Sequence, residues 1–171
     1  MSDRPIANIH DLHAKHTRAG SRYETHAARI GSVIGARDLG AQYMTVPAGK
    51  AGFPRHSHRN NEEMFIILEG EGTYRRGDES WAIKAGDVIS APAGDVSTAH
   101  QITNTSTADL KYLAVSTRND PDICEYPDSG KFMVVAGIRA GGGMLDADFV
   151  LRGRDKPLLD YWDGEDIGED K

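Results

Sequence analysis

His56-Ser-His58-Arg-Asn-Asn-Glu62-Glu63-Met-Phe-Ile-Ile-Leu-Glu-Gly70 is the stretch that decides the fold. It begins with two histidines two positions apart and runs through a glutamate into an apolar segment that ends at a glycine. Side chains two positions apart on an extended strand point to the same face, so His56 and His58 can reach one ion. Imidazole and carboxylate groups are ligands of divalent transition metals. The stretch therefore predicts a metal site built on β-strands.

A second block follows further along the chain and offers a third imidazole. It begins with Gly86 and a short apolar strand, continues through Pro92 and Gly94, and ends in His100-Gln-Ile-Thr-Asn104. The glycines and the proline are turn residues, whereas the apolar, β-branched positions between them favour strands. His100 is thus a third candidate ligand on another strand.

The two blocks together resemble the paired motifs of the cupin superfamily. The positions that match are His56, His58, Glu63 and Gly70 for the first motif, and Gly86, Pro92, Gly94, His100 and Asn104 for the second. The resemblance implies an all-β fold, a double-stranded β-helix (jelly-roll) barrel with N- and C-terminal extensions. It also implies one divalent transition metal per chain, held by His56, His58, Glu63 and His100.

The chain departs from the family pattern at two places. One extra residue separates Gly49 from His56, and five residues separate Gly94 from His100 where the family usually has two. Ser97 consequently occupies the usual histidine position. We interpret this as a three-residue insertion, because the spacing from His100 to Asn104 is kept. The alternative, in which the metal has only three protein ligands, stays open.

The choice between Glu62 and Glu63 as the carboxylate ligand follows from strand register. The distance to Gly70 fits Glu63, and neighbouring strand residues point to opposite faces, so Glu62 is expected to face away. Alternation from Glu63 places Phe65 and Ile67 on its own face. We therefore expect apolar surroundings for the metal on that strand.

Composition indicates one soluble, cytoplasmic domain. The chain has 171 residues, one cysteine, a polar start and no stretch long enough to span a membrane. Its net charge of −6 is concentrated at the C-terminus, where the last twelve residues hold six acids and one lysine. No basic stripe is present, so we expect no nucleic-acid partner. The acidic tail is interpreted as a solvated, partly disordered end.

We divide the chain into an N-terminal arm (1–37), the cupin barrel (38–117) and a C-terminal extension with the acidic tail (118–171). The arm is expected to supply an edge strand and a short helix, and its histidines at 10, 13 and 16 are interpreted as surface residues. Strands are predicted around 73–75, 81–83, 88–90, 100–104, 110–117 and 132–136. Because the aromatic pair Tyr161-Trp162 needs a surface to pack against, and because small cupins commonly pair, we expect a homodimer.

The resemblance implies a function but no single reaction. A metal-dependent enzyme of the dioxygenase or isomerase type, acting on a small polar organic substrate, is the leading hypothesis, and similar bacterial single-domain cupins carry a provisional sugar-phosphate-isomerase label. Iron or manganese is favoured as the metal, with nickel, zinc, cobalt and copper as alternatives. The alternative function is a non-catalytic module that binds a small, sugar-like ligand.

Overall fold

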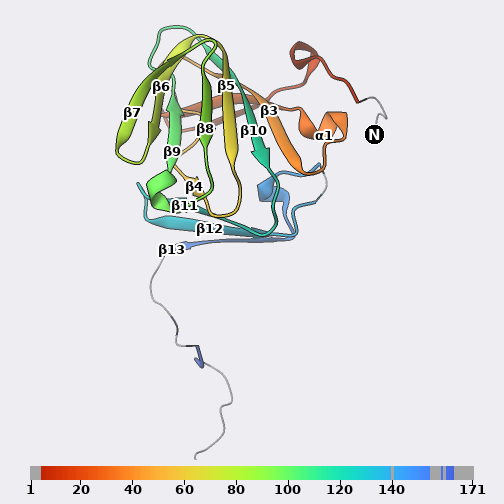
Figure 1. The fold of residues 1–171 in the computed structure, drawn as a ribbon, viewed down its shortest axis with the longest axis vertical. Helices are drawn as coiled ribbons and strands as arrows, with labels where there is room; N and C mark the ends of the chain where they lie inside the picture. Colours follow the sequence, from red (N-terminus) through yellow and green to blue (C-terminus); the bar gives the residue numbers. More distant parts are fainter. Residues whose placement is uncertain (1–4, 140, 155–158, 160, 164–171) are drawn as a thin grey trace, which may run out of the picture.

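The computed structural model describes residues 5–139, 141–154, 159 and 161–163, and most of its elements are β-strands. The all-β class predicted from the sequence is therefore confirmed. Figure 1 shows a barrel of upright strands with a further sheet running across its lower end. Among the described residues, no helix has the length and apolar character that crossing a membrane would require.

The largest sheet has six antiparallel strands in the order β1-β2-β3-β10-β5-β8. β10 lies between β3 and β5, so strands distant in the sequence form the middle of the sheet. The bounds are β1 Lys15–Ala19, β2 Tyr23–Arg29, β3 Leu39–Val46, β10 Leu110–Thr117, β5 Glu63–Glu69 and β8 Val88–Ala91.

Two smaller sheets complete the architecture, in the orders β7-β6-β9 and β13-β12-β11-β4. Backbone hydrogen bonds between His56 and His100 link them, with N–O distances of 3.1 and 2.8 Å. This bridge places the residue before β4 beside the first residue of β9. The bounds are β7 Glu79–Lys84, β6 Glu71–Arg76, β9 His100–Thr103, β13 Phe149–Arg154, β12 Lys131–Ala136, β11 Asp122–Tyr126 and β4 Ser57–His58.

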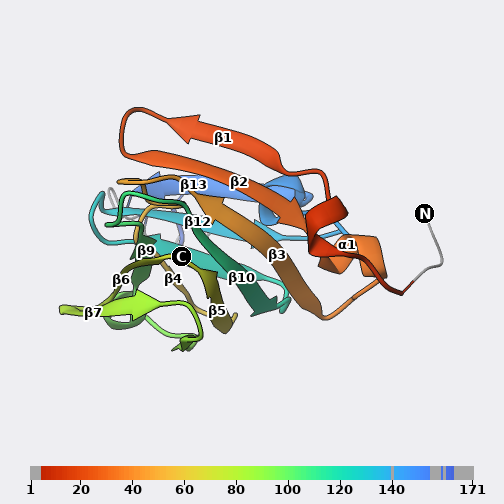
Figure 2. The ribbon, with the colours of Figure 1, turned by 90° about the horizontal axis from the view of Figure 1, so that it is seen from above.

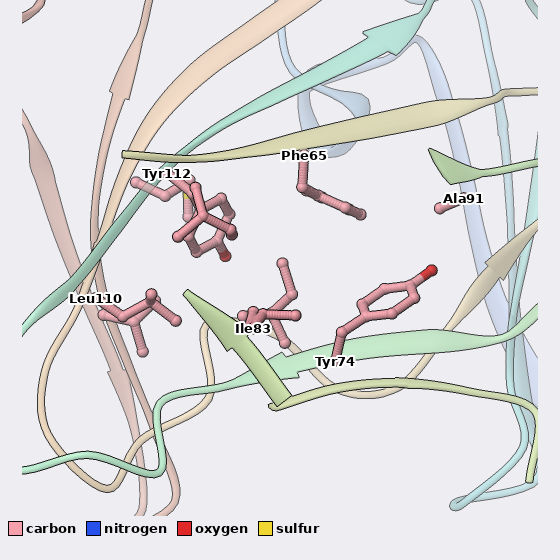
Figure 3. Close-up of a cluster of buried hydrophobic side chains, with 10 residues drawn as sticks. Phe65, Tyr74, Ile83, Ala91, Leu110 and Tyr112 are labelled. Carbon is pink, nitrogen blue, oxygen red and sulfur yellow. The ribbon is translucent and has the colours of Figure 1, made fainter. Parts of the chain in front are cut away.

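The barrel core is filled by the inward side chains of these strands. Phe65 and Ile67 are 7% and 1% exposed, as the alternation from Glu63 predicts, whereas Met64 points outward. Figure 3 shows the rings of Phe65 and Tyr74 pointing into the barrel interior. The core cluster consists of Met44, Val46, Phe65, Ile67, Tyr74, Ile83, Ala91, Ile102, Leu110 and Tyr112.

The N-terminal arm adds to the six-stranded sheet. The prediction of an edge strand and a short helix is borne out by β1 at the sheet edge and by α1 (Gly31–Ile34), and β2 is a further strand between β1 and the barrel. Figure 2 shows β1 and β2 lying along one side of the barrel, away from β6 and β7.

The C-terminal extension contributes β11, β12 and β13 to the sheet below the barrel, and β4 completes it. The strand predicted at 132–136 is found as β12, and its buried residues Met133 and Val135 pack with Cys124 of β11 in a second core cluster. Tyr161 and Trp162 contact each other edge to face, with ring centroids 4.7 Å apart. Most of the acidic tail, residues 164–171 and Asp160, lies outside the described residues.

Candidate metal centre

The four predicted ligands come together where β4, β5 and β9 meet. His58 lies on β4, Glu63 begins β5 and His100 begins β9, while the backbone bridge to His100 holds His56. β4 also pairs with β11, with His58 opposite Cys124. Backbone pairing therefore holds both histidines of the first block, His56 through His100 and His58 through Cys124.

Glu63 lies at the middle of this cluster. Its Oε2 atom is 2.9 Å from Nε2 of His100, 3.5 Å from Nε2 of His58 and 3.8 Å from Nε2 of His56. All four side chains are largely buried, at 17% exposure or less. The arrangement thus directs three imidazole nitrogens and one carboxylate oxygen at a common region.

The other ring nitrogen of each histidine is engaged outside the cluster. Nδ1 of His56 lies 2.8 Å from the carbonyl oxygen of Pro54, and Nδ1 of His100 lies 3.3 Å from that of Thr98. A carbonyl oxygen only accepts hydrogen bonds, so Nδ1 is the donor in both contacts. In a neutral imidazole, this leaves the lone pair on Nε2, the atom that faces Glu63. Such contacts fix the tautomer of metal-binding histidines.

His58 has a buried carboxylate as its outer partner. Its Nδ1 lies 2.7 Å from Oδ2 of Asp122, whose side chain is fully buried, and 3.4 Å from Sγ of Cys124. The other oxygen of Asp122 accepts hydrogen bonds from the backbone N–H groups of Asn60 and Ile123. Asp122 is therefore held rigidly behind His58, in the carboxylate–histidine arrangement that orients metal ligands.

Sequence reasoning missed Asp122 and the position of Cys124. Both lie on β11, in the C-terminal extension and outside the two motifs, and both are fully buried. The only sequence signal is their period of two on a short strand, which places both side chains on one face. That signal says nothing about which strand the face meets.

Burial and mutual charge shift the acidities within the cluster. Burial would raise the pKa of Glu63, but the hydrogen bond from His100 and the nearby histidine charges lower it to about 2. Burial lowers the pKa of His56 to about 4, although Glu63 opposes this. Burial would also lower the pKa of His58, but hydrogen bonds to Asp122 and Cys124 raise it to about 11. In the metal-free protein at neutral pH, the His58 ring is thus protonated on both nitrogens and carries a positive charge.

Metal binding is expected to displace that proton. Nε2 of His58 has to be unprotonated to bind a metal, whereas the raised pKa of about 11 keeps the ring protonated without one. We expect the release of about one proton per metal at pH 7. Calorimetric titration with manganese in two buffers of different ionisation enthalpy measures this number. No proton release would contradict the protonation of His58 in the metal-free state.

An Asp122→Asn substitution is expected to weaken metal binding by about 10–100-fold. The asparagine oxygen can keep the backbone hydrogen bonds, which turns the amide N–H₂ toward His58. The ring is then driven to the tautomer that protonates Nε2. A competition assay with a chelating dye measures the change. Asp78→Asn, in the exposed β6–β7 turn, is the matched control, and equal affinity of both variants would rule out this role of Asp122.

The insertion in the second motif forms a short 3-10 turn at Val96–Thr98. Ser97, at the usual histidine position, has its hydroxyl 2.6 Å from Asp95 within this turn, whereas His100 lies beside Glu63.

Asn104, the last residue of the second motif, has a structural role. Asn104 is fully buried and its amide donates to the carbonyls of Val46 and Ala108. It thereby secures the turn between β9 and β10.

Aromatic rings form the walls of the cluster. The ring centroids of Phe65 and Tyr74 lie 5.5 and 6.2 Å from that of His100, and the ring of Tyr126 stacks on His56 at 5.9 Å. Burial raises the pKa of Tyr74 and of Tyr126 to about 12, so both phenols stay protonated at neutral pH. The wall contributed by β5 is apolar, as predicted.

Residues 42–116 match the family model described as Cupin domain. The oxalate-binding protein of Thermotoga maritima is 38% identical over 72 residues, which are 42% of this chain and 56% of the relative. An uncharacterized protein of Methanocaldococcus jannaschii is 35% identical over 72 residues, which are 42% of this chain and 48% of that protein. The chain thus spans about half the length of the curated relatives it matches.

Solved structures share the fold over most of the chain. A sugar phosphate isomerase from a cupin superfamily, from Silicibacter pomeroyi, has a TM-score of 0.73 at 21% identity and covers 91% of this chain and 97% of its own. A predicted oxalate decarboxylase from Thermotoga maritima has a TM-score of 0.58 at 25% identity and covers 67% of this chain and 99% of its own. The double-stranded β-helix predicted from the sequence is therefore confirmed.

Proposed function

Starting from the premise that residues 42–116 of this chain are a cupin domain, we propose that the protein is a metal-dependent enzyme acting on a small polar organic molecule. Nε2 of His56, His58 and His100 and the carboxylate of Glu63 would hold one divalent ion, iron or manganese. A bound ion of this kind acts as a Lewis acid toward an oxygen of the substrate or supports oxygen chemistry. The absence of a thiolate among these four ligands suits either metal.

The observation that carries the proposal is the convergence of three imidazole nitrogens on one buried carboxylate oxygen. Nδ1 of His56 donates to the carbonyl of Pro54, so Nε2 of the neutral ring is an acceptor, yet it faces the carboxylate of Glu63 at 3.8 Å. Nε2 of His100 lies 2.9 Å and Nε2 of His58 3.5 Å from the same carboxylate. One divalent ion bound by all four side chains would neutralise this buried carboxylate and use each of these ring nitrogens. The donor set therefore fits a divalent ion.

The surrounding residues would orient the ligands and limit the entry of water. Asp122 holds the ring of His58 by its Nδ1 hydrogen, and the backbone bridge between His56 and His100 fixes the spacing of their rings. Phe65 and Tyr74 cover the barrel side of the cluster. A dry wall strengthens the electrostatic interaction between an ion and a substrate oxygen.

A hollow of about 190 Å³ would offer room for a substrate next to the residues that contact His56. Its lining includes none of the four candidate ligands and contains the apolar residues Phe132, Met133 and Leu145. Two of its lining residues, Pro54 and Tyr126, contact the His56 ring, and two others, Lys131 and Arg152, supply positive charge. A small molecule with a carboxylate or phosphate group fits this combination of charge and size. The name of the oxalate-binding relative agrees with a small carboxylate.

The enzyme proposal is tested with manganese- and iron-loaded protein and a panel of hydroxy-carboxylates and sugar phosphates. Oxygen uptake, measured with an electrode, reports dioxygenase chemistry, and proton NMR of the same mixtures reports isomerisation or decarboxylation. Turnover that is lost in His56→Ala/His58→Ala protein supports the proposal. A panel without turnover, despite stoichiometric metal, contradicts it for these substrate classes.

A binding module is the second candidate function. It is favoured by the 38% identity over 72 residues to a protein named for binding oxalate. If the protein is a binding module, its metal-loaded form would bind about one oxalate per chain and release it chemically unchanged. Calorimetric titration with oxalate, followed by NMR of the recovered ligand, separates the two candidates.

A further inference from the structure

We propose a second metal site, on the outer face of the β1–β2 hairpin, formed by His16, Glu24 and His26. One donor atom from each of the three side chains lies within 4.8 Å of the other two. None of the three belongs to the cupin motifs or touches the metal centre in the barrel. The ligand class, two imidazoles and a carboxylate, is that of Zn²⁺ and similar borderline ions.

Strand pairing brings the three residues together. His16 of β1 lies directly opposite His26 of β2, and Glu24 is two positions before His26 on the same strand face. Thr25, between them, is 1% exposed and points inward, so its two neighbours point away from the barrel. Figure 2 shows β1 and β2 side by side along one flank of the molecule. The site is therefore reached from solvent without any rearrangement of the barrel.

The donor atoms are close enough to share an ion once the stacked rings turn toward it. The His16 and His26 rings are stacked, with centroids 4.5 Å apart and planes 14° apart, and Nε2 of His16 lies 3.2 Å from Oε1 of Glu24. Donors bound to one ion at about 2.1 Å lie roughly 3–3.5 Å apart. His16 is exposed, so its ring is free to turn toward an ion, and an ion there would replace Arg18, 3.8 Å away, as the cationic partner of Glu24.

A metal at this position would fasten the sheet edge. β1 is paired on one side only, by β2, and all five of its residues are exposed. The exposed contact of His16 with Glu24 adds little to stability by itself, because water competes for both side chains. Coordination by one residue of β1 and two of β2 would instead join the strands and slow their opening.

Zinc titration of the full chain tests the site. Wild-type protein is expected to bind two zinc ions per chain after dialysis at micromolar free zinc, and the His26→Ala variant is expected to bind one zinc ion. The control is His13→Ala, which changes an exposed histidine of the same arm and should still bind two zinc ions. The His56→Ala/His58→Ala variant is expected to keep the hairpin ion and to lose it when His26→Ala is added. Equal zinc in wild type and His26→Ala would overturn the proposal.

Hydrogen exchange gives a readout that does not depend on counting ions. Amides of β1 and β2 are expected to exchange more slowly in wild-type protein with zinc than without it, and the difference should vanish in His26→Ala. Unchanged exchange in the wild-type hairpin would place any second zinc ion elsewhere and reject the site.

Discussion

The His56→Ala/His58→Ala protein is expected to retain less than about a tenth of the iron or manganese of the wild type after gel filtration, because a mononuclear site needs about four protein ligands to compete with water. Two of the four Nε2 and carboxylate donors are removed, and both lie within 3.8 Å of Glu63. Elemental analysis of protein purified without chelator gives the metal content per chain. Zinc is measured separately, since the hairpin site would hold it.

The matched control for this variant is His10→Ala/His13→Ala, which removes two imidazoles from the exposed arm. It is expected to keep the wild-type content of iron or manganese. Circular dichroism establishes whether each protein is folded. Full metal retention by folded His56→Ala/His58→Ala protein would refute the assignment of the metal centre.

The Glu63→Gln variant is expected to lose metal affinity by more than about 100-fold, beyond the effect of changing an outer partner such as Asp122. Glu63 is the only carboxylate within 4 Å of the three Nε2 atoms among the described residues. Its replacement removes the negative charge that compensates the metal and leaves the protonated His58 without an inner partner. A chelator competition assay with manganese measures the loss.

Glu62→Gln is the matched control for Glu63→Gln, since it makes the same substitution and removes the same charge one residue earlier. Glu62 is exposed, and it is its backbone N–H that bonds to Thr117. This variant should therefore bind metal as the wild type does. Metal loss in Glu62→Gln with retention in Glu63→Gln would reverse the two roles and would mean that the register of β5 is shifted.

Much of the fold was predictable because it depends on local patterns. The alternation of Glu63, Phe65 and Ile67 predicts which face of β5 is buried, and turn residues such as Gly86 and Gly70 mark where strands end. Gly70 has a φ of +82°, and a Cβ there would lie 2.4 Å from the carbonyl oxygen of Asp109, so only glycine fits this turn. Patterns of this kind are read from a few neighbouring residues.

The choice of His100 over Ser97 illustrates how far spacing can be used. The kept interval to Asn104 points to His100, and the structure accommodates the extra residues in the 3-10 turn at Val96–Thr98. Asn104 is buried and fixed by hydrogen bonds to Val46 and Ala108. The strand that begins at His100 is therefore anchored at its far end.

By itself, the sequence indicated several barrel strands and the buried face of β5, which follow from the period along single strands, and the four candidate ligands, which follow from the resemblance of two short motifs. Tertiary structure alone decided that Asp122 and Cys124 lie behind His58 and that His16 faces His26 across a hairpin. These contacts depend on which strands pair and in which register. Pairing and register are set by the burial of the whole core, which no short window of residues contains.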